Sequence, residues 1–525
     1  MSPRSHKTAL GLGLVLLATL AVYAPSLRNG FAMDDLWIAR PADDAGRPLP
    51  LVGRVAPLRD YFGANYHAVS GHLSELYRPV TILSYALVNA AQRPGMSEAL
   101  QAAPHHALNL FLHLVATGLV YSLVRDAGGG RRGGLIAAAV FGLHGIHSEV
   151  VANVVGRAEL LGFVGGAMAT RVWVDARPGG RTWSVMARAV VAASLLFLAF
   201  GAKESALAWA GWLPLYAVVR GRAALPAVAL AVVPAAVYLG LRTAMIAALP
   251  GAVPPIEWAA NPLAQVDTVT RVCTGLCVWG YGLAMTLLPF GALRADYGPP
   301  TFGLASSLVD VRVLGATAGL LAVAVGALLA GRRRPLLLLA GAAFLGFSCI
   351  TSNLPFAVGT IFGERLYYTP SLGVALAGAS VAGAVARWPR LAQSAAALTL
   401  LAWLGLSAGQ IWRRNPVWRS DEALFLAEAA HEPPSVRMLV CAAEVVRMRG
   451  DLARAETLLR RAVALAPDYA LAWNNLGATL LNLDQLDEAE AALLRARRAR
   501  QALPAGQEQM IEANLAAVRD ARPPR

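Results

Sequence analysis

Long apolar runs recur along almost the whole of this chain of 525 residues. A helix of about 20 apolar residues is long enough to cross the hydrocarbon core of a bilayer. Eleven runs have this character, at residues 9–27, 105–124, 133–149, 157–174, 184–202, 205–219, 224–247, 311–331, 335–352, 366–386 and 391–411. The sequence therefore predicts an all-α, polytopic membrane bundle with about eleven spans.

Composition favours a membrane protein over a soluble one. Hydrophobic residues make up 56% of the chain and charged residues 15%, whereas a soluble protein has about 25% charged residues. The net charge of +14 comes from arginines dispersed between the apolar runs, a pattern typical of cytoplasmic loops. We therefore expect no nucleic-acid partner. Only Lys7 and Lys203 of the 46 basic residues are lysines, and this preference for arginine indicates a GC-rich bacterial genome.

The cysteines argue against two further classes of protein. Cys273, Cys277, Cys349 and Cys441 are too few for a disulfide framework in so long a chain. None of them forms the C-x2-C spacing of a structural metal site. We therefore expect neither redox chemistry nor a bound metal.

Basic residues between the spans set the predicted orientation. Eleven crossings place the arginine-rich stretches on one side of the membrane with the N terminus, at residues 125–132, 177–188, 220–222, 332–334 and 387–390. By the positive-inside rule this side is the cytoplasm. The opposite side then receives the loop 28–104 and everything after Trp412. We expect a multi-pass protein of the bacterial inner membrane whose C-terminal part lies outside the cytoplasm.

Two apolar segments allow more than one interpretation. The run 9–27 follows a basic start and fits either a signal peptide or a first membrane helix, and the many later spans favour the helix. The stretch 271–290 is apolar enough to span but breaks the alternation of sides. We interpret it as a re-entrant or paired short segment.

After Arg413 the sequence changes to a helical pattern with a period of 34 residues. In the second copy, Trp473-Asn474-Asn475-Leu476-Gly477 fits the tetratricopeptide pattern W-x2-L-G. We predict a membrane domain over residues 1–412 and a small tetratricopeptide α-solenoid over 413–525, with two helix pairs and a capping helix near 506–519. The array is either a peptide-binding surface, with Trp473, Asn474 and Asn475 as acceptor contacts, or a spacer.

Asp34 and Asp35 follow the first span and are the first candidates for chemistry. Two adjacent carboxylates at the membrane surface can take a proton from an acceptor hydroxyl or bind a cation. A solvated acidic turn explains them equally well. The nearby Asp43-Asp44 pair lies in a stretch rich in proline and glycine, and we assign it to a solvated turn.

Histidines are concentrated near the predicted outer surface. Seven of the nine lie between residues 67 and 147, namely His67, His72, His105, His106, His113, His144 and His147. His105, Asn109 and His113 share one helix face, either as site residues or as polar residues packed between helices. His144 and His147 lack a third ligand at metal-site spacing, so we expect them to contact a phosphate or a sugar.

Charged residues at the ends of the early spans extend this polar layer. Arg78 precedes a short apolar stretch, 80–90, which we expect to lie along the outer interface, where Arg78 can meet a lipid phosphate. Arg157 and Glu159 begin the fourth span. An unpaired charge is costly there, so we expect both to be paired.

Two later pairs complete a predicted cavity that opens outward. Lys203, one of two lysines, is followed by Glu204 at an outer helix junction. Its compact ammonium suits a phosphate, and neutralisation by Glu204 is the alternative. Glu364 and Arg365 precede the tenth span in the same layer.

In their common order, these motifs resemble the transmembrane and tetratricopeptide repeat-containing family of proteins, similar to polyprenyl-phosphate-sugar glycosyltransferases with the GT-C fold. The resemblance covers Phe31 to Asp35, Tyr77-Arg78-Pro79, His105 to His113, Phe141 to Leu161, Lys203-Glu204, Ala295-Asp296-Tyr297, Glu364 to Ser371 and the repeats. Three features depart from the family pattern. Met33 replaces an aromatic residue, Gly145 replaces a proline, and the array has about two repeats where the family has many.

The resemblance implies transfer of a mannosyl-type sugar from a polyprenyl-phosphate donor to Ser or Thr hydroxyls of an extracytoplasmic protein, by a single inverting displacement. It implies Asp34 or Asp35 as the general base. Donor phosphate or sugar contacts are expected from Arg78, His105, His144, His147, Arg157, Glu159, Lys203, Glu204, Glu364 and Arg365. Fixed cations can stabilise the departing phosphate, so no cofactor is required. The expected partners are the lipid-linked sugar, a protein or peptide acceptor and membrane lipids.

Two other functions remain open at this point. A membrane-anchored assembly factor that recruits partners explains the repeats but not the charges in the spans. A transporter explains such charges, but no inverted repeat is evident and the charges gather at one face instead of the midplane.

Overall fold

The computed structural model describes residues 3–93, 95–175, 182–499 and 507–522. Within these residues the chain is helical, and its extended pairing is limited to one isolated bridge. The longer helices up to residue 414 are α1 (Pro3–Tyr23), α4 (Pro79–Ala90), α5 (Glu98–Val124), α6 (Gly130–Gly142), α8 (Arg157–Val174), α9 (Thr182–Ala202), α10 (Trp209–Val219), α11 (Ala224–Ala247), α12 (Thr268–Leu287), α13 (Val311–Gly331), α14 (Pro335–Cys349), α15 (Leu372–Val385) and α16 (Arg390–Arg414). The predicted all-α class is confirmed.

Shorter helices lie between these and after them. Near the early loops they are α2 (Asp35–Ile38), α3 (Leu58–Phe62) and α7 (Ser148–Ala152). The C-terminal helices are α17 (Asp421–Ala429), α18 (Val436–Met448), α19 (Leu452–Leu465), α20 (Ala470–Asn482), α21 (Leu486–Arg498) and α22 (Gln507–Ala521).

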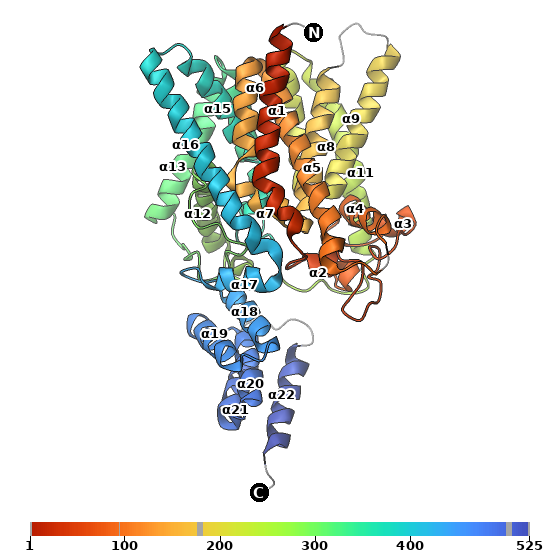
Figure 1. Cartoon of the computed structure of the whole chain (residues 1–525), viewed down its shortest axis with the longest axis vertical. Helices are drawn as coiled ribbons and strands as arrows, with labels where there is room; N and C mark the ends of the chain where they lie inside the picture. Colours follow the sequence, from red (N-terminus) through yellow and green to blue (C-terminus); the bar gives the residue numbers. More distant parts are fainter. Residues whose placement is uncertain (1–2, 94, 176–181, 500–506, 523–525) are drawn as a thin grey trace.

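Figure 1 shows two parts stacked along the long axis of the molecule. Helices α1 to α16 form a bundle, and α17 to α22 extend from one end of it (Figure 1). We call this end the repeat end. The N terminus lies at the other end, which we call the basic end because Arg171 and Arg220 meet around Asp126 there. The N terminus and the repeats therefore lie at opposite ends of the bundle, as an odd number of crossings would place them.

Most predicted spans coincide with helices. Residues 157–174, 224–247 and 311–331 begin and end where α8, α11 and α13 do. By length and hydropathy, six helices of the described residues can cross a membrane, or seven if one pair bent by 107° counts as a span. Three shorter apolar helices, α4, α14 and α15, accompany them. The chain is a multi-pass membrane protein, and the number of eleven crossings stays a prediction.

Three predicted spans are interrupted at the repeat end. Helix α6 ends at Gly142 and is followed by the short helix η4 (Gly145–His147) and by α7. Likewise, η6 (Glu204–Ala208) precedes α10, and η8 (Glu364–Tyr367) precedes α15. Non-helical backbone at membrane depth is tolerated where protein or a cavity satisfies its polar groups. The interruptions therefore mark a polar layer at this end of the bundle.

The segment predicted to be re-entrant or paired forms one unbroken helix, α12, and α12 is not among the helices that can cross a membrane by length and hydropathy. Arg271 near its start donates to the carbonyl oxygens of Asn353 and Leu354 at 2.9 and 2.5 Å. The carbonyl oxygen of Thr286 near its end lies 2.8 Å from Nε2 of His144. Asn353 and Leu354 follow α14, and His144 follows α6. Both of these helices run from the basic end to the repeat end, so the two ends of α12 contact segments at the repeat end.

Small residues let the bundle helices approach one another closely. Helices in a membrane gain little from burial against lipid and associate through close packing, so small residues line their interfaces. Gly165 of α8 lies against Ala199 of α9, and Gly166 lies against the indole of Trp209. A Cβ atom on Gly166 would lie 2.3 Å from two indole carbon atoms. These contacts fix the position of α8, which carries Arg157 and Glu159 at the repeat end.

The C-terminal helices form the predicted repeat array. Helices α18 and α19 pack as one pair and α20 and α21 as the next, with Gly477 of α20 against Leu493 of α21. Ala455 and Ala489, which are 34 residues apart, are both fully buried. Helix α22 packs on α20 and α21 as the predicted capping helix, and residue 506 lies outside the described residues.

Replacing Gly166 with alanine should destabilise the bundle. The added methyl group meets the indole of Trp209, and overpacking of this kind costs about 1 to 3 kcal/mol. Gly118→Ala on α5 is the matched control, because no atom lies within 4 Å of its Cβ position. We expect a lower thermal unfolding midpoint in detergent for Gly166→Ala and an unchanged one for Gly118→Ala. Equal midpoints would contradict the close approach of α8 to Trp209.

Candidate functional site

The two adjacent carboxylates of the first loop lie in different environments. Asp35 is fully buried and accepts hydrogen bonds from the backbone N–H groups of Val154 and Val155 at 3.1 and 2.8 Å. It also accepts one from the N–H of Ala32 at 3.4 Å. Asp34 is exposed. Asp35 therefore holds the loop on the bundle, whereas Asp34 offers an accessible carboxylate.

The C-terminal part of the chain holds the same loop from the other side. The N–H of Gly30 donates to the carbonyl oxygen of Arg419 at 3.0 Å, and the N–H of Met33 donates to Oδ1 of Asp421 at 2.5 Å. Met33 has a φ of 56°, which is uncommon for a residue with a side chain. Such strained backbone persists when surrounding contacts impose it, and it clusters at functional sites. The residue after it is Asp34.

A first ion pair lies beside this loop. Arg78 donates through Nε to Glu204 at 2.9 Å, and the second oxygen of Glu204 accepts the N–H of Tyr77 at 2.9 Å. The Arg78 guanidinium lies over the ring of Tyr66, 4.7 Å from its centroid. Among the described contacts, Glu204 bonds to the Nε atom of Arg78, which leaves the two terminal nitrogens as donors for another acceptor.

Lys203 pairs with Glu159, and not with its neighbour Glu204 as one alternative proposed. Its Nζ lies 3.0 Å from Oε1 of Glu159, and both side chains are buried. Lys203 has extended backbone, with φ −153° and ψ 131°, and successive side chains of extended backbone point to opposite sides. Lys203 and Glu204 consequently join different helices, and the charges pair between elements.

Glu159 is paired as expected, with Lys203, whereas Arg157 bonds to neutral groups and not to Glu159. Residues two apart on a helix do not face one another. Arg157 is fully buried, donates to Oδ1 of Asn109 at 2.9 Å and to the carbonyl oxygen of His105 at 2.9 Å, and lies over the ring of Tyr85. Arg157 thus organises the polar core beneath the loop.

Arg365 is held by Glu149. Its NH1 atom and its backbone N–H bind the two oxygens of Glu149 at 2.5 and 3.0 Å. Asp34 lies within electrostatic range of Arg365, of Arg437 on α18 and of His67. Arg78 and Arg365 are likewise both within electrostatic range of Lys203. The three predicted cations Arg78, Lys203 and Arg365 therefore interact with one another as a cation cluster, and Arg365 links this cluster to Asp34.

The predicted histidines are enclosed by protein. His105 bonds to Asn89 at 2.8 Å, and His144 bonds to the carbonyl oxygen of Thr286. His147 bonds to Oγ of Ser371 at 2.7 Å. All three are fully buried, so we do not carry them forward as phosphate or sugar contacts. For His105 this is the alternative of a polar residue packed between helices.

Glu364 is a buried link between two loops. Its Oε1 atom accepts from Tyr297 Oη at 2.7 Å and from the backbone N–H of Arg294 at 2.5 Å. Burial raises the pKa of Glu364 to about 8. A carboxyl group that is neutral at pH 7 contributes no charge to the cation cluster, and we omit Glu364 from the donor contacts.

The residues predicted to bind an acceptor in the repeats have partners within the array. The indole N–H of Trp473 donates to the carbonyl oxygen of Pro467 at 2.7 Å, and Arg495 lies over its ring. Asn474 accepts from Asn514 of α22 at 3.0 Å and donates to Asn475 at 3.4 Å. These three side chains hold the repeats together.

Several neighbours of Asp34 escaped prediction from the sequence. His67 was noted only as one of many histidines, and Glu149 only as part of a histidine-rich segment. Asp421 and Arg437 carry no motif, because each is one charged residue among many in an amphipathic helical pattern. These residues are far from Asp34 in the sequence, so no local sequence pattern could predict that they lie in the same region.

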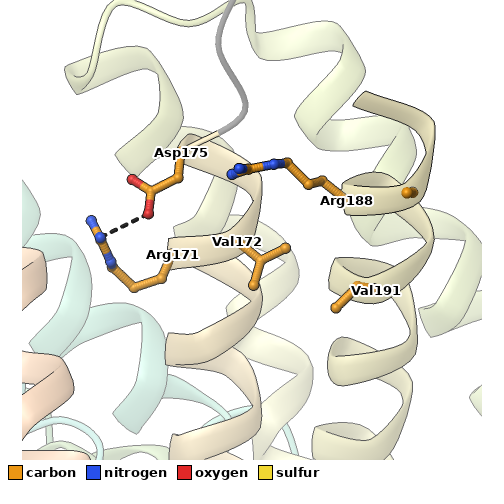
Figure 2. Close-up of a pocket in the computed structure, with 6 residues that line it drawn as sticks. Arg171, Val172, Asp175, Arg188 and Val191 are labelled. Atoms are coloured by element: carbon orange, nitrogen blue, oxygen red, sulfur yellow. Dashed lines mark hydrogen bonds and ion pairs between the residues drawn. The ribbon is translucent and has the colours of Figure 1, made fainter. Parts of the chain in front are cut away.

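Among the described residues, no group of three or more His, Cys, Asp or Glu side chains is arranged to hold a metal ion. A cavity of about 380 Å³ lies between α8 and α9 at the basic end. Arg171 pairs with Asp175 there at 2.8 Å, and Arg188 extends from the other wall (Figure 2). Helix α8 separates this cavity from Glu159, so it belongs to a different region.

Comparisons with known proteins match both parts of the chain. A tetratricopeptide repeat family model matches residues 458–491. The chain is 26% identical to "Protein O-mannosyl-transferase TMTC3" of Mus musculus, over 92% of this chain and 54% of the relative. It is 24% identical to "Protein O-mannosyl-transferase F38B6.6" of Caenorhabditis elegans, over 89% of this chain and 65% of the relative. With "Protein O-mannosyl-transferase Tmtc1" of Drosophila melanogaster the identity is 33%, over 30% of this chain and 17% of the relative.

The family resemblance predicted from the sequence is confirmed by these matches. The chain spans about half the length of the mouse relative. No solved structure is significantly similar to it.

Asp35→Asn should change how stability depends on pH. Burial raises the pKa of Asp35 from 3.8 to about 7, so the folded protein keeps a proton that the unfolded chain has lost. The stabilisation is complete below pH 3.8 and is lost as the pH rises through 7. Asparagine does not titrate, and its amide also replaces an acceptor oxygen, at a cost of about 1 to 3 kcal/mol.

Thermal unfolding midpoints at pH 5 and pH 8 test this expectation. The midpoint of the wild type should fall more between these pH values than that of Asp35→Asn. Asp44→Asn is the control, because Asp44 is an exposed carboxylate of the same loop. An identical fall in wild type and Asp35→Asn would show that Asp35 does not titrate in this range.

Proposed function

We propose, from the similarity of this chain to protein O-mannosyl-transferases, that it is a membrane glycosyltransferase acting on proteins. It transfers a sugar, mannose in our proposal, from a polyprenyl-phosphate donor to hydroxyl groups of a protein or peptide acceptor. The observation that carries the proposal is an exposed carboxylate, Asp34, whose charge interacts with that of Arg365 at one end of a membrane bundle. Lys203 interacts in turn with Arg365 and Arg78. No cofactor is required in this proposal.

Asp34 is the proposed general base. A base must reach the acceptor hydroxyl, and Asp34 is exposed whereas Asp35 is enclosed by backbone N–H groups. Asp34 takes the hydroxyl proton as the acceptor oxygen attacks the anomeric carbon. The bond from that carbon to the phosphate oxygen breaks on the opposite face, so the configuration inverts.

The cation cluster is the proposed site of the donor phosphate. The polyprenyl phosphate leaves as an anion, and fixed positive charges stabilise charge that develops in a transition state. Arg78 and Lys203 are each held by a glutamate from another element, at 2.9 and 3.0 Å. This pairing fixes their positions and leaves further N–H donors for phosphate oxygens.

The place of the site in the bundle suits a lipid-linked donor. A polyprenyl chain lies among the lipids while its phosphate lies at the interface, and the cluster occupies the end of the bundle where three spans are interrupted. We place the repeat end outside the cytoplasm of a bacterial inner membrane, because the arginine-rich end meets the positive-inside rule. The acceptor then reaches Asp34 from the aqueous side.

Asp34→Asn should remove sugar transfer while the protein stays folded. Loss of a general base lowers the rate by about 100-fold to 10,000-fold. The measurement is incorporation of radiolabelled sugar from polyprenyl-phosphate-mannose into protein, in membranes that contain each variant. Asp44→Asn should retain full transfer. Full activity in Asp34→Asn would remove the base assignment, and no transfer by folded wild type with several donors would favour an assembly factor instead.

Arg78→Gln should weaken the use of the donor. A hydrogen bond to a charged group contributes about 1.5 to 3 kcal/mol, so kcat/KM for the donor should fall by about 10-fold to 100-fold. Arg59→Gln on α3 is the matched control, because Arg59 is an exposed arginine of the same loop. An unchanged kcat/KM for the donor in Arg78→Gln would place the phosphate elsewhere.

A further inference from the structure

The buried carboxylate of Asp296 joins the bundle to the first repeat helix. Its Oδ1 atom accepts from NH2 of Arg437 at 2.7 Å, and its Oδ2 atom accepts from the hydroxyl of Ser435. Ser435 and Arg437 stand at the start of α18. Asp296 belongs to the Ala295-Asp296-Tyr297 motif, which had no role in the sequence analysis. This motif meets the repeats directly.

Further contacts fix the array against the same face. Arg294 donates to the carbonyl oxygens of Glu432 and Pro433 at 3.1 and 2.7 Å. Tyr469 at the start of α20 donates through its hydroxyl to Glu257 at 2.7 Å. Both helix pairs are thus bound to loops of the bundle. The array is docked in a fixed position and is not a freely tethered module.

This docking places a cation of the repeats beside Asp34. Ala32 of the first loop and Val436, the residue before Arg437, belong to one buried apolar cluster. The charge of Arg437 interacts there with those of Asp34 and Arg365. Among the described residues, the charged and titratable groups that interact with Asp34 are Asp35 on its own element, Tyr66, His67, Arg365, Asp421 of α17 and Arg437 of α18. Arginines from two different parts of the chain therefore flank one exposed carboxylate.

We propose that Arg437 is a positioning residue supplied by the repeat array, which Asp296 aims at Asp34 so that the base is oriented for the acceptor hydroxyl. This inference rests on the proposed function. Asp296 uses one end of the guanidinium, and the remaining charge attracts the Asp34 carboxylate. The site is therefore complete only when the array is docked, and the first repeat helix forms one of its walls.

A charge exchange separates this role from simple anchoring. Asp296→Arg combined with Arg437→Asp restores an ion pair between bundle and repeats but puts a negative charge beside Asp34. Arg437→Gln removes both the pair and the charge, and Arg437→Lys keeps the charge with different geometry. Arg461→Gln on α19 is the matched control, because Arg461 forms an exposed pair with Glu432. Each full-length variant is assayed for kcat, for KM of donor and acceptor, and for its thermal midpoint.

We expect Arg437→Gln to lower kcat by about 10-fold to 100-fold, with the donor KM changed less than about twofold, as for the loss of one interaction with a charge. Arg437→Lys should recover much of this loss. The charge exchange should recover the thermal midpoint lost in Arg437→Gln but not kcat. Arg461→Gln should match the wild type in every measurement.

Recovery of kcat by the charge exchange would overturn the inference, because anchoring alone would then suffice. An unchanged kcat in Arg437→Gln would also overturn it, and so would equal losses in Arg437→Lys and Arg437→Gln if the charge exchange did not fold. In each of these cases the wild type transfers sugar and the proposed function stands. A folded wild type without transfer would contradict the proposed function itself.

Discussion

The carboxylate of Asp35 is the contact on which the repeat end of the molecule is organised. It accepts the N–H groups of Val154 and Val155, immediately before α8 begins at Arg157. One buried side chain thus joins the first loop to the helix that carries Arg157 and Glu159. A buried acceptor that leaves its donors unsatisfied is costly, so the loop cannot shift without disturbing α8. Because Asp34 is the chain neighbour of Asp35, its backbone is held in place by the same contacts.

The charges of this layer follow a second constraint. Unpaired charges are costly where water is scarce, and the structure pairs Lys203 with Glu159 and Arg78 with Glu204. Each pair joins segments that are far apart in sequence. The pairs hold the bundle together at the polar layer and position cations that keep donors free. Structural and functional roles are therefore combined in the same side chains.

The sequence predicted the large features because they arise from local patterns. Apolar runs of spanning length predicted the helices, with identical bounds at α8, α11 and α13, and the 34-residue period predicted the array. It also brought Asp34, Arg78, Lys203 and Arg365 forward as candidates. It did not predict which carboxylate pairs with which cation. The neighbours Lys203 and Glu204 turn to opposite sides because the backbone is extended there, a property that residue order does not reveal.

The contacts between repeats and bundle were beyond prediction for a similar reason. Asp421 and Arg437 acquire their place beside Asp34 through tertiary docking, and nothing in their local sequence distinguishes them from other charged residues of amphipathic helices. The histidines, by contrast, were predicted as site residues from their chemistry alone. The structure uses His105, His144 and His147 as hydrogen-bonded parts of the bundle interior.

The way in which the array is attached has a consequence for its length. The contacts to the bundle come from α17 and from residues at the starts of α18 and α20. The described hydrogen bonds and ion pairs of α21 and α22 stay within the array. New helix pairs inserted ahead of α22 would extend the distal end and leave the docked end untouched. Array length can therefore change without altering the contacts that dock the first repeat helices on the bundle.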